Sequence, residues 1–387
     1  PLMKSQGLPY LRGLAQLGLK IHLLTFEKSV SSSFSSEDEL RRELMSEGVI
    51  WTRMRYHKWP PFLSTLFDVI GAWIVVSRII LRFGVNVIEA RGTIPAGIGY
   101  PLARFFRLRF LFNVRGLLGE ENIDAGRWQR NHPLVRWINR LEKRWILRAD
   151  AVIVLTDAMK LLLAGVGFLP RPRRDRVTVI PCCVDTDRFL PMPRREIGME
   201  DSPIFVYAGS LGGYYLVREM FEFFAVASDR WPLSRFRLLA NGFDDVAKQA
   251  VEASNLDPER FEVETVQHET VPNRLASSSV GLIFVRSSFA RVGMSPTKLA
   301  EYLACGLPVI ATQQIGDTGS ILKEDRTGVV ISELGREAYE EACESLAGLL
   351  KEREVLSKRC RESAICRFGI QRGLKGYRKV LRDLGFF

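Results

Sequence analysis

Short apolar runs alternate with longer segments of mixed polarity along the first half of the chain. The run at 18–26 (GLKIHLLTF) follows a helical stretch at 9–17 and is typical of a strand. Further strands are predicted at 86–89, 110–114, 151–156 and 177–181, with helices around 62–82, 97–107, 132–148 and 157–164. Strands that alternate with helices of this length predict βαβ units and a parallel sheet.

The same alternation begins again after a proline-rich break between 181 and 193. Strands are predicted in this second series at 204–208, 237–240, 261–263, 280–284 and 308–311. We therefore predict an α/β protein of two doubly wound, Rossmann-like domains, 1–189 and 190–370, that face a central cleft. Such sheets bind ligands at the carboxyl ends of their strands.

Three segments of the chain depart from the regular alternation of strands and helices. The sequence opens in what reads as a loop and helix, so the first strand of the N-terminal domain is expected to be missing. The serine-rich segment 31–36 and the Pro- and Arg-rich segment 163–175 are predicted to be loops.

One segment, 62–80 (FLSTLFDVIGAWIVVSRII), is apolar enough to suggest a membrane. Asp68 and Arg78 interrupt it, whereas a spanning helix needs about 20 mostly apolar residues. We expect a largely buried core helix that does not span a membrane, with a helix at the membrane interface as the alternative.

The net positive charge of the chain comes entirely from its N-terminal half. Residues 1–185 have 28 Lys+Arg and 16 Asp+Glu, an excess of twelve, while the remainder has 27 and 28. Such a half attracts an anionic partner, for which a membrane surface or a phosphate-bearing acceptor is our first expectation. A solvated basic surface without a ligand is the alternative. No nucleic-acid partner is expected, because no recognition module accompanies the charge.

Several other functional classes find no support in the sequence. The six cysteines lack zinc or disulfide spacing, the four histidines lack ligand spacing, and no signal peptide opens the chain, so a cytoplasmic protein without a metal is expected. No Gly-x-Gly-x-x-Gly motif follows a strand, which argues against a dehydrogenase. Asp185-Thr186-Asp187 has the form of a metal-binding DxD motif, but we expect a structural role there.

The most informative segment is 280–321, in which a buried strand leads through a polar loop into a helix that starts near Ser295-Pro296. Proline is favourable in a first helical turn, and the free amides and dipole at a helix N-terminus suit a phosphate. Lys298 stands in that turn, where the dipole disfavours a cation unless an anion is bound there. Glu301, one turn on, can accept hydrogen bonds from vicinal hydroxyls such as those of a ribose.

Five segments in order resemble the GT-B glycosyltransferases, specifically the family-4-like group of bacterial polysaccharide enzymes. SPTKLAEYLACGLPVIA resembles their donor-site helix, and FVYAGSLGGYY their first donor-domain strand and glycine loop. FNVRGLLGEENIDAGRW is similar to an acceptor-domain strand and loop, and RADAVIVLTDAMK and VTVIPCCVDTDRFLP to the segments before the second domain. In this family the last helix, here 371–387, packs back on the N-terminal domain.

The resemblance assigns roles to individual residues. Glu301 matches the glutamate that holds the donor ribose, and Gln267 and His268 fall in the base-contacting loop. The donor phosphates or sugar are expected to meet Gly209, Ser210, Gly212 and Gly213 of the glycine loop and Ser295, Pro296 and Thr297 of the helix turn.

The sequence departs from the family pattern at three positions. Gly293 stands where many relatives have a second glutamate, and the glycine loop lacks their basic pair. Lys298, Arg286 and Arg291 are therefore our candidates to neutralise the diphosphate. The acceptor-domain histidine of many relatives is also absent, and Arg115 stands in that region instead. The catalytic candidates are therefore Lys298, Glu301 and Arg115.

The resemblance thus implies transfer of a sugar from a nucleotide diphosphate donor, with a UDP-sugar such as UDP-glucose as the first candidate, to a saccharide or lipid-linked hydroxyl in polysaccharide biosynthesis. Retention of anomeric configuration, no metal and no cofactor beyond the donor are expected, in the cytoplasm or at the inner membrane face. The alternatives are a sugar-nucleotide epimerase of the same fold and a non-catalytic nucleotide-sugar or polysaccharide-binding protein.

Overall fold

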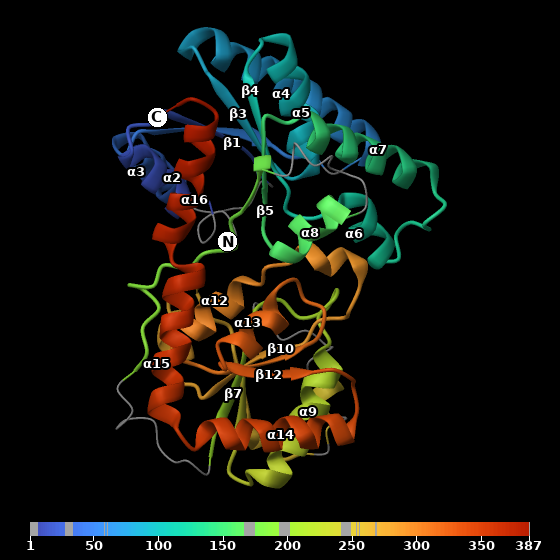
Figure 1. Ribbon diagram of the computed structural model, residues 1–387, viewed down its shortest axis with the longest axis vertical. Helices are drawn as coiled ribbons and strands as arrows, with labels where there is room; N and C mark the ends of the chain where they lie inside the picture. Colours follow the sequence, from blue (N-terminus) through green and yellow to red (C-terminus); the bar gives the residue numbers. More distant parts are fainter. Residues whose placement is uncertain are drawn as a thin grey trace.

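The computed structural model describes residues 7–27, 34–57, 59, 61–165, 175–192, 202–240, 249–252, 254, 256–267 and 269–386. Two α/β domains lie one above the other in Figure 1, with parallel strands in both. The prediction of two doubly wound domains is therefore confirmed. The expected domain boundary near 190 lies just before residues 193–201, which are outside the described part.

The C-terminal domain holds a six-stranded parallel sheet in the order β12-β11-β10-β7-β8-β9. In chain order this is 6-5-4-1-2-3, the usual doubly wound arrangement, in which the first and fourth strands meet at the ligand-binding edge. Its strands are β7 (Ile204–Ala208), β8 (Arg235–Leu239), β9 (Phe261–Glu264), β10 (Val280–Ile283), β11 (Val309–Thr312) and β12 (Gly328–Ile331).

Helices cover both faces of this sheet, because its central strands are apolar on both sides. They are α9 (Val217–Arg230), α11 (Val271–Ala276), α12 (Thr297–Ala304), α13 (Thr318–Glu324), α14 (Arg336–Leu350) and α15 (Arg353–Ser363), with short turns η3 (Pro258–Arg260), η4 (Phe289–Gly293) and η5 (Ala364–Phe368). The strand β12 was not predicted from the sequence. Its run of four residues is too short to show a period.

The N-terminal domain has two separate parallel sheets, β1-β2 and β3-β4-β5-β6. In the usual doubly wound order the first strand lies between the places that β1 and β3 occupy here. The described residues supply no strand between them. The strands are β1 (Ile21–Glu27), β2 (Val49–Arg55), β3 (Val87–Arg91), β4 (Arg109–Asn113), β5 (Ala151–Val154) and β6 (Val177–Val179).

Two elements of this domain differ from the sequence prediction. The strand β2 was missed, and its residues do not alternate regularly in burial. The expected loop at 31–36 is wrong in its second half, because α3 (Phe34–Ser46) begins at Phe34. This helix packs on β2 through Leu40 and the buried Leu44, a contact that its serine-rich start conceals. The predicted loop at 163–175 lies mostly outside the described residues.

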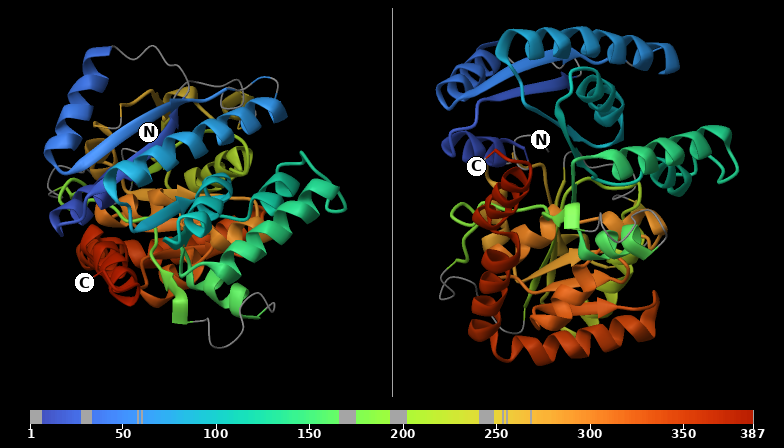
Figure 2. Two further views of the ribbon diagram at one scale, coloured as in Figure 1. Left: turned by 90° about the horizontal axis from the view of Figure 1, so that it is seen from above. Right: turned by 45° about the horizontal axis from the view of Figure 1, so that its top comes forward.

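The remaining helices of the N-terminal domain are α2 (Leu8–Gln16), α4 (Pro61–Phe83), α5 (Thr93–Phe105), α6 (Leu118–Asp124), α7 (Pro133–Arg148) and α8 (Asp157–Gly165). The expectation that α4 is largely buried is wrong. Among the described residues it is the one helix long and apolar enough to cross a membrane, yet only 22% of its apolar window is buried. Figure 2 shows it along the outer surface, at the top of the right-hand view.

The last helix, α16 (Ile370–Asp383), leaves the C-terminal domain after α15 and lies against α2 of the other domain (Figure 1). The ring of Tyr377 packs against that of Tyr10, with the centroids 5.3 Å apart and the ring planes tilted by 54°. Gly373 permits this approach, since a Cβ there would lie 2.5 Å from the Tyr10 ring. The chain thereby crosses between the domains twice, which holds them face to face.

Candidate active site

The glycine loop leaves β7 at the ligand-binding edge of the six-stranded sheet. Gly209, Gly212 and Gly213 have φ values of 142°, 96° and 69°, a backbone region that glycine adopts without strain. Tyr207 donates a hydrogen bond from its hydroxyl to the Ser210 carbonyl at 2.5 Å. The loop therefore presents its backbone, with the Ser210 side chain exposed.

Lys298 lies directly beneath this loop. It is 6% exposed, and its Nζ lies 3.9 Å from the ring centroids of Tyr207 and Tyr215. A Cβ at Gly209 would be only 2.9 Å from Nζ, so the amine touches the loop backbone. No described residue accepts a hydrogen bond from Nζ. A buried amine without an acceptor is costly unless a ligand supplies one.

The helix that carries Lys298 is α12, which begins at Thr297 with Pro296 as its N-cap. The sequence predicted a start about two residues earlier. Pro296 has an extended backbone, with ψ at 122°, and so precedes the helix. The first amides of a helix have no partner within it, and they point along the positive end of its dipole.

Glu301 follows one turn into α12 and is partly buried. Burial raises its pKa to about 7, against the opposing effect of the positive Lys298 and Arg188. Burial likewise lowers the pKa of Lys298 to about 7, while Glu301 favours its charged form. The two groups share one site of low polarity, in which an anionic ligand would favour the ammonium form of the lysine.

Tyr302 fixes α12 against the start of the glycine loop. Its hydroxyl accepts a hydrogen bond from the Ala208 amide at 2.8 Å. Its ring packs on Gly281 of β10, where a Cβ would lie 2.2 Å from a ring carbon. The backbone of β7, the loop and α12 are thereby held in one geometry.

The two candidate arginines occupy different positions. Arg286 is exposed, and its amide donates to the Tyr214 carbonyl at 2.9 Å, so it stands beside the glycine loop. Arg291 is buried, stacks on Tyr214 at 3.9 Å and forms an ion pair with Asp124 of α6. Arg291 thus joins the two domains, and a diphosphate would have to compete with Asp124 for it.

The acceptor-domain side of the site begins at the end of β4. Arg115 donates to the Cys182 sulfur at 3.2 Å, and Ser295 accepts from the Cys182 amide at 3.2 Å, so Cys182 links both predicted loops. Gly116 lies under the Glu121 carboxylate, which a Cβ there would meet at 2.0 Å. Burial raises the pKa of Glu121, and the nearby Arg291 and Arg127 lower it.

Sequence reasoning missed Glu121, Asp124 and the two tyrosines around Lys298. The acidic run GEENID directly after the β4 loop was the available signal for the first two. Gln267 lies exposed beyond β9, and its predicted neighbour His268 is outside the described residues. The assigned roles of all these donor-site residues stay predictions.

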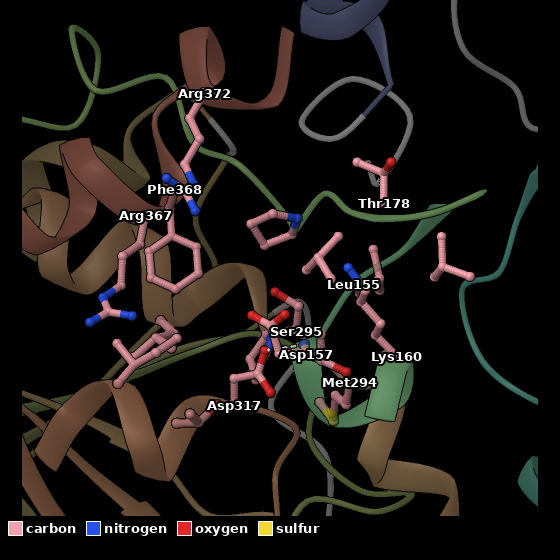
Figure 3. Close-up of a pocket in the computed structure, with 18 of the residues that line it drawn as sticks. Leu155, Asp157, Lys160, Thr178, Met294, Ser295, Asp317, Arg367, Phe368 and Arg372 are labelled. Atoms are coloured by element: carbon pink, nitrogen blue, oxygen red, sulfur yellow. Dashed lines mark hydrogen bonds between the residues drawn. The ribbon is translucent and has the colours of Figure 1, made fainter. Parts of the chain in front are cut away.

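A cavity of about 520 Å³ lies between the domains, beside the candidate donor site. Figure 3 shows Leu155 and Lys160 on one side of it and Arg367 and Phe368 on the other. Ser295 and Pro296 form part of its wall, whereas the glycine loop, Lys298 and Glu301 are not among its lining residues. It is therefore a neighbour of the donor site and not that site itself.

In the described part of the chain, no three His, Cys, Asp or Glu side chains lie close enough together to hold a metal ion. Within the DxD-like motif, Asp185 accepts hydrogen bonds from the amides of Asp187 and Arg188 at 3.0 and 3.3 Å. This carboxylate caps a turn between the domains.

Two protein-family models match the chain, one on each domain. Residues 10–188 match Glycosyltransferase Family 4, and residues 202–348 match Glycosyl transferases group 1. A search of curated proteins finds no match.

Solved structures of the same fold cover nearly the whole chain. Sucrose-phosphate synthase from Thermosynechococcus elongatus has a TM-score of 0.70 at 17% identity, covering 97% of this chain and 91% of its own. A glycosyltransferase from Rickettsia africae has a TM-score of 0.68 at 16% identity, and the match covers 95% of this chain and 99% of that one. Anabaena HepE, solved with UDP and glucose, has a TM-score of 0.67 at 14% identity, covering 97% and 95%.

Fold, site and family models define an enzyme of the GT-B glycosyltransferase class. The chain belongs to the family-4-like group of these enzymes, as its motifs predicted.

Proposed function

We propose that this enzyme transfers a sugar from a UDP-sugar, with UDP-glucose as the first candidate, to a hydroxyl of a saccharide or lipid-linked acceptor in polysaccharide biosynthesis. The observation that carries the proposal is the buried, unpartnered amine of Lys298 beneath the glycine loop. HepE, of the same fold, is described with UDP and with UDP-glucose, which supports the choice of donor.

Departure of the nucleoside diphosphate is the step that this geometry serves. The Lys298 amine lies against Gly209 of the glycine loop, in the first turn of α12, at the positive end of that helix's dipole. Preorganised charges and dipoles of this kind stabilise the negative charge that grows on a leaving group. We propose that they do so without a metal and with retention of anomeric configuration, the outcome that the family resemblance implies.

The acceptor is proposed to bind on the basic N-terminal domain, near Arg115 and Glu121. The excess of positive charge in residues 1–185 suits a phosphate-bearing acceptor and an anionic membrane. We propose that the enzyme works in the cytoplasm, peripherally at the inner membrane face.

Replacing Glu301 by glutamine is expected to weaken UDP binding about 10- to 150-fold, because a hydrogen bond to a charged group is worth about 1.5–3 kcal/mol. Titration calorimetry with UDP and with 2′,3′-dideoxy-UDP tests the ribose contact. Wild type should discriminate between the two ligands and Glu301→Gln should not. Glu344→Gln, on the exposed face of α14, is the control. Equal UDP affinity of Glu301→Gln and wild type would refute the donor-site assignment.

UDP binding at pH 8 is expected to take up as much as one proton. The pKa of Lys298 is lowered to about 7 by burial, so at pH 8 the free amine is mostly neutral. A diphosphate beside Nζ favours the ammonium form and raises that pKa, so binding draws a proton from the buffer. Calorimetry in buffers of different ionisation enthalpy measures this uptake. Lys298→Met should abolish it, and a wild-type value near zero would contradict a contact between Lys298 and the diphosphate.

A further inference from the structure

The outward face of α4 carries large apolar side chains, whereas its inward face combines Val69, Val76 and Ile80 with small or polar residues. Ser64, Asp68 and Ala72 are buried at four-residue spacing against the rest of the domain. The exposed side chains on the other face are Leu63, Leu66, Phe67, Ile70, Trp73 and Ile74.

The one acidic residue that interrupts this apolar segment, Asp68, points inward. The Asp68 carboxylate accepts hydrogen bonds from the His57 amide at 3.0 Å and from His57 Nδ1 at 2.6 Å. The outward face of α4 is therefore free of acidic groups. An exposed apolar patch of this extent marks a site of interaction.

The charge around α4 identifies the kind of partner. Residues 48–88 contain five Lys+Arg and, with Asp68, one acidic residue. Arg78 and Arg82 are exposed at the C-terminal end of α4, and Arg53 and Arg55 are exposed on β2 beside it. A second copy of the chain would bring two basic surfaces together across this face. An anionic bilayer offers apolar chains to the exposed face and negative headgroups to its border.

We propose that α4 lies in the plane of an anionic membrane, with its Leu, Phe, Ile and Trp side chains inserted at the headgroup boundary and the arginines on the headgroups. This rests on the proposed membrane partner and assigns the contact to one helix. Docking through α4 would set the N-terminal domain on the lipid surface, with the C-terminal domain farther from it (Figure 2).

The test measures sedimentation of the full chain with vesicles of phosphatidylcholine alone or with one third phosphatidylglycerol, without donor. Wild type should bind the anionic vesicles more tightly, and part of that binding should persist in 1 M salt, because inserted apolar groups are not screened. Phe67→Asp with Ile74→Asp should weaken binding at least tenfold. The control variant Leu233→Asp with Val355→Asp, on the C-terminal domain, should bind like wild type. Its two side chains are 65% and 54% exposed, which matches the 65% of Phe67 and the 51% of Ile74.

Three results would overturn the proposal: equal binding by the α4 variant and wild type, complete loss of wild-type binding in salt, or a wild-type dimer in light scattering that the α4 substitutions dissociate. The second result would leave a membrane partner held by charge alone. Glu301→Gln should bind vesicles like wild type, so failure of the donor-site assignment and failure of the α4 proposal are distinguishable.

Discussion

Lys298→Ala should lower turnover by about a hundredfold at saturating donor while leaving the binding of free uridine nearly unchanged. Removal of one preorganised charge from a developing anion typically costs on the order of 3 kcal/mol in the transition state. Lys298 is suited to this role because its amine touches Gly209 and has no acceptor among the described residues. Steady-state kinetics with a UDP-sugar and calorimetry with uridine measure the two effects.

Two companion variants separate charge from packing. Lys298→Met keeps most of the side-chain volume between Tyr207 and Tyr215 and should lose as much activity as alanine. Lys323→Ala removes an exposed lysine from the last turn of α13 and should leave turnover unchanged. If the activity of Lys298→Ala stayed within threefold of wild type, Arg286 or Arg291, and not Lys298, would be the residue that neutralises the diphosphate.

Asp124→Asn should destabilise the protein by about 3 kcal/mol, because it leaves the buried Arg291 guanidinium without its carboxylate. Their side chains are 9% and 10% exposed, and breaking a buried ion pair on one side typically costs 3–5 kcal/mol. The lower end applies because the Glu121 carboxylate remains close to Arg291. Urea unfolding measures the loss, and small-angle scattering should show the domains farther apart.

The matched control is Asp229→Asn, which removes the partner of Arg336 in an exposed ion pair on the C-terminal domain. Exposed pairs are worth about 0–1 kcal/mol, so this variant should unfold nearly as wild type does. The double variant Asp124→Asn with Arg291→Met should recover much of the stability, since it no longer buries an unpaired charge. Equal losses for Asp124→Asn and Asp229→Asn would show that the domain contact does not depend on this pair.

Local patterns alone were enough to predict most strands, both doubly wound domains and the helix α12. A glycine loop after a buried strand and a proline before a helix act through the backbone of a few neighbouring residues, so their conformation is written in a short segment. The SPTKLAE segment and Gly209, Gly212 and Gly213 are of this kind, and family membership followed from them.

The strands β2 and β12 and the start of α3 were missed because their main support is packing on distant elements. The Leu44 side chain shows that α3 belongs to the core only once β2 lies beneath it. For α4, apolar composition predicted burial, yet composition does not say which face a helix turns inward. Ser64, Asp68 and Ala72 pack against the domain together with Ile80, which leaves most of the large side chains in the first half of α4 outside.

By itself, therefore, the sequence determined the class of enzyme and the two-domain plan, and it supplied the predicted donor-site residues. Only the tertiary structure decided how those residues are buried and paired. It buries Lys298 between Tyr207 and Tyr215, and it pairs Arg291 with Asp124, 167 residues away. The physical reason is that burial and charge pairing depend on contacts between segments far apart in the chain, which no local pattern encodes.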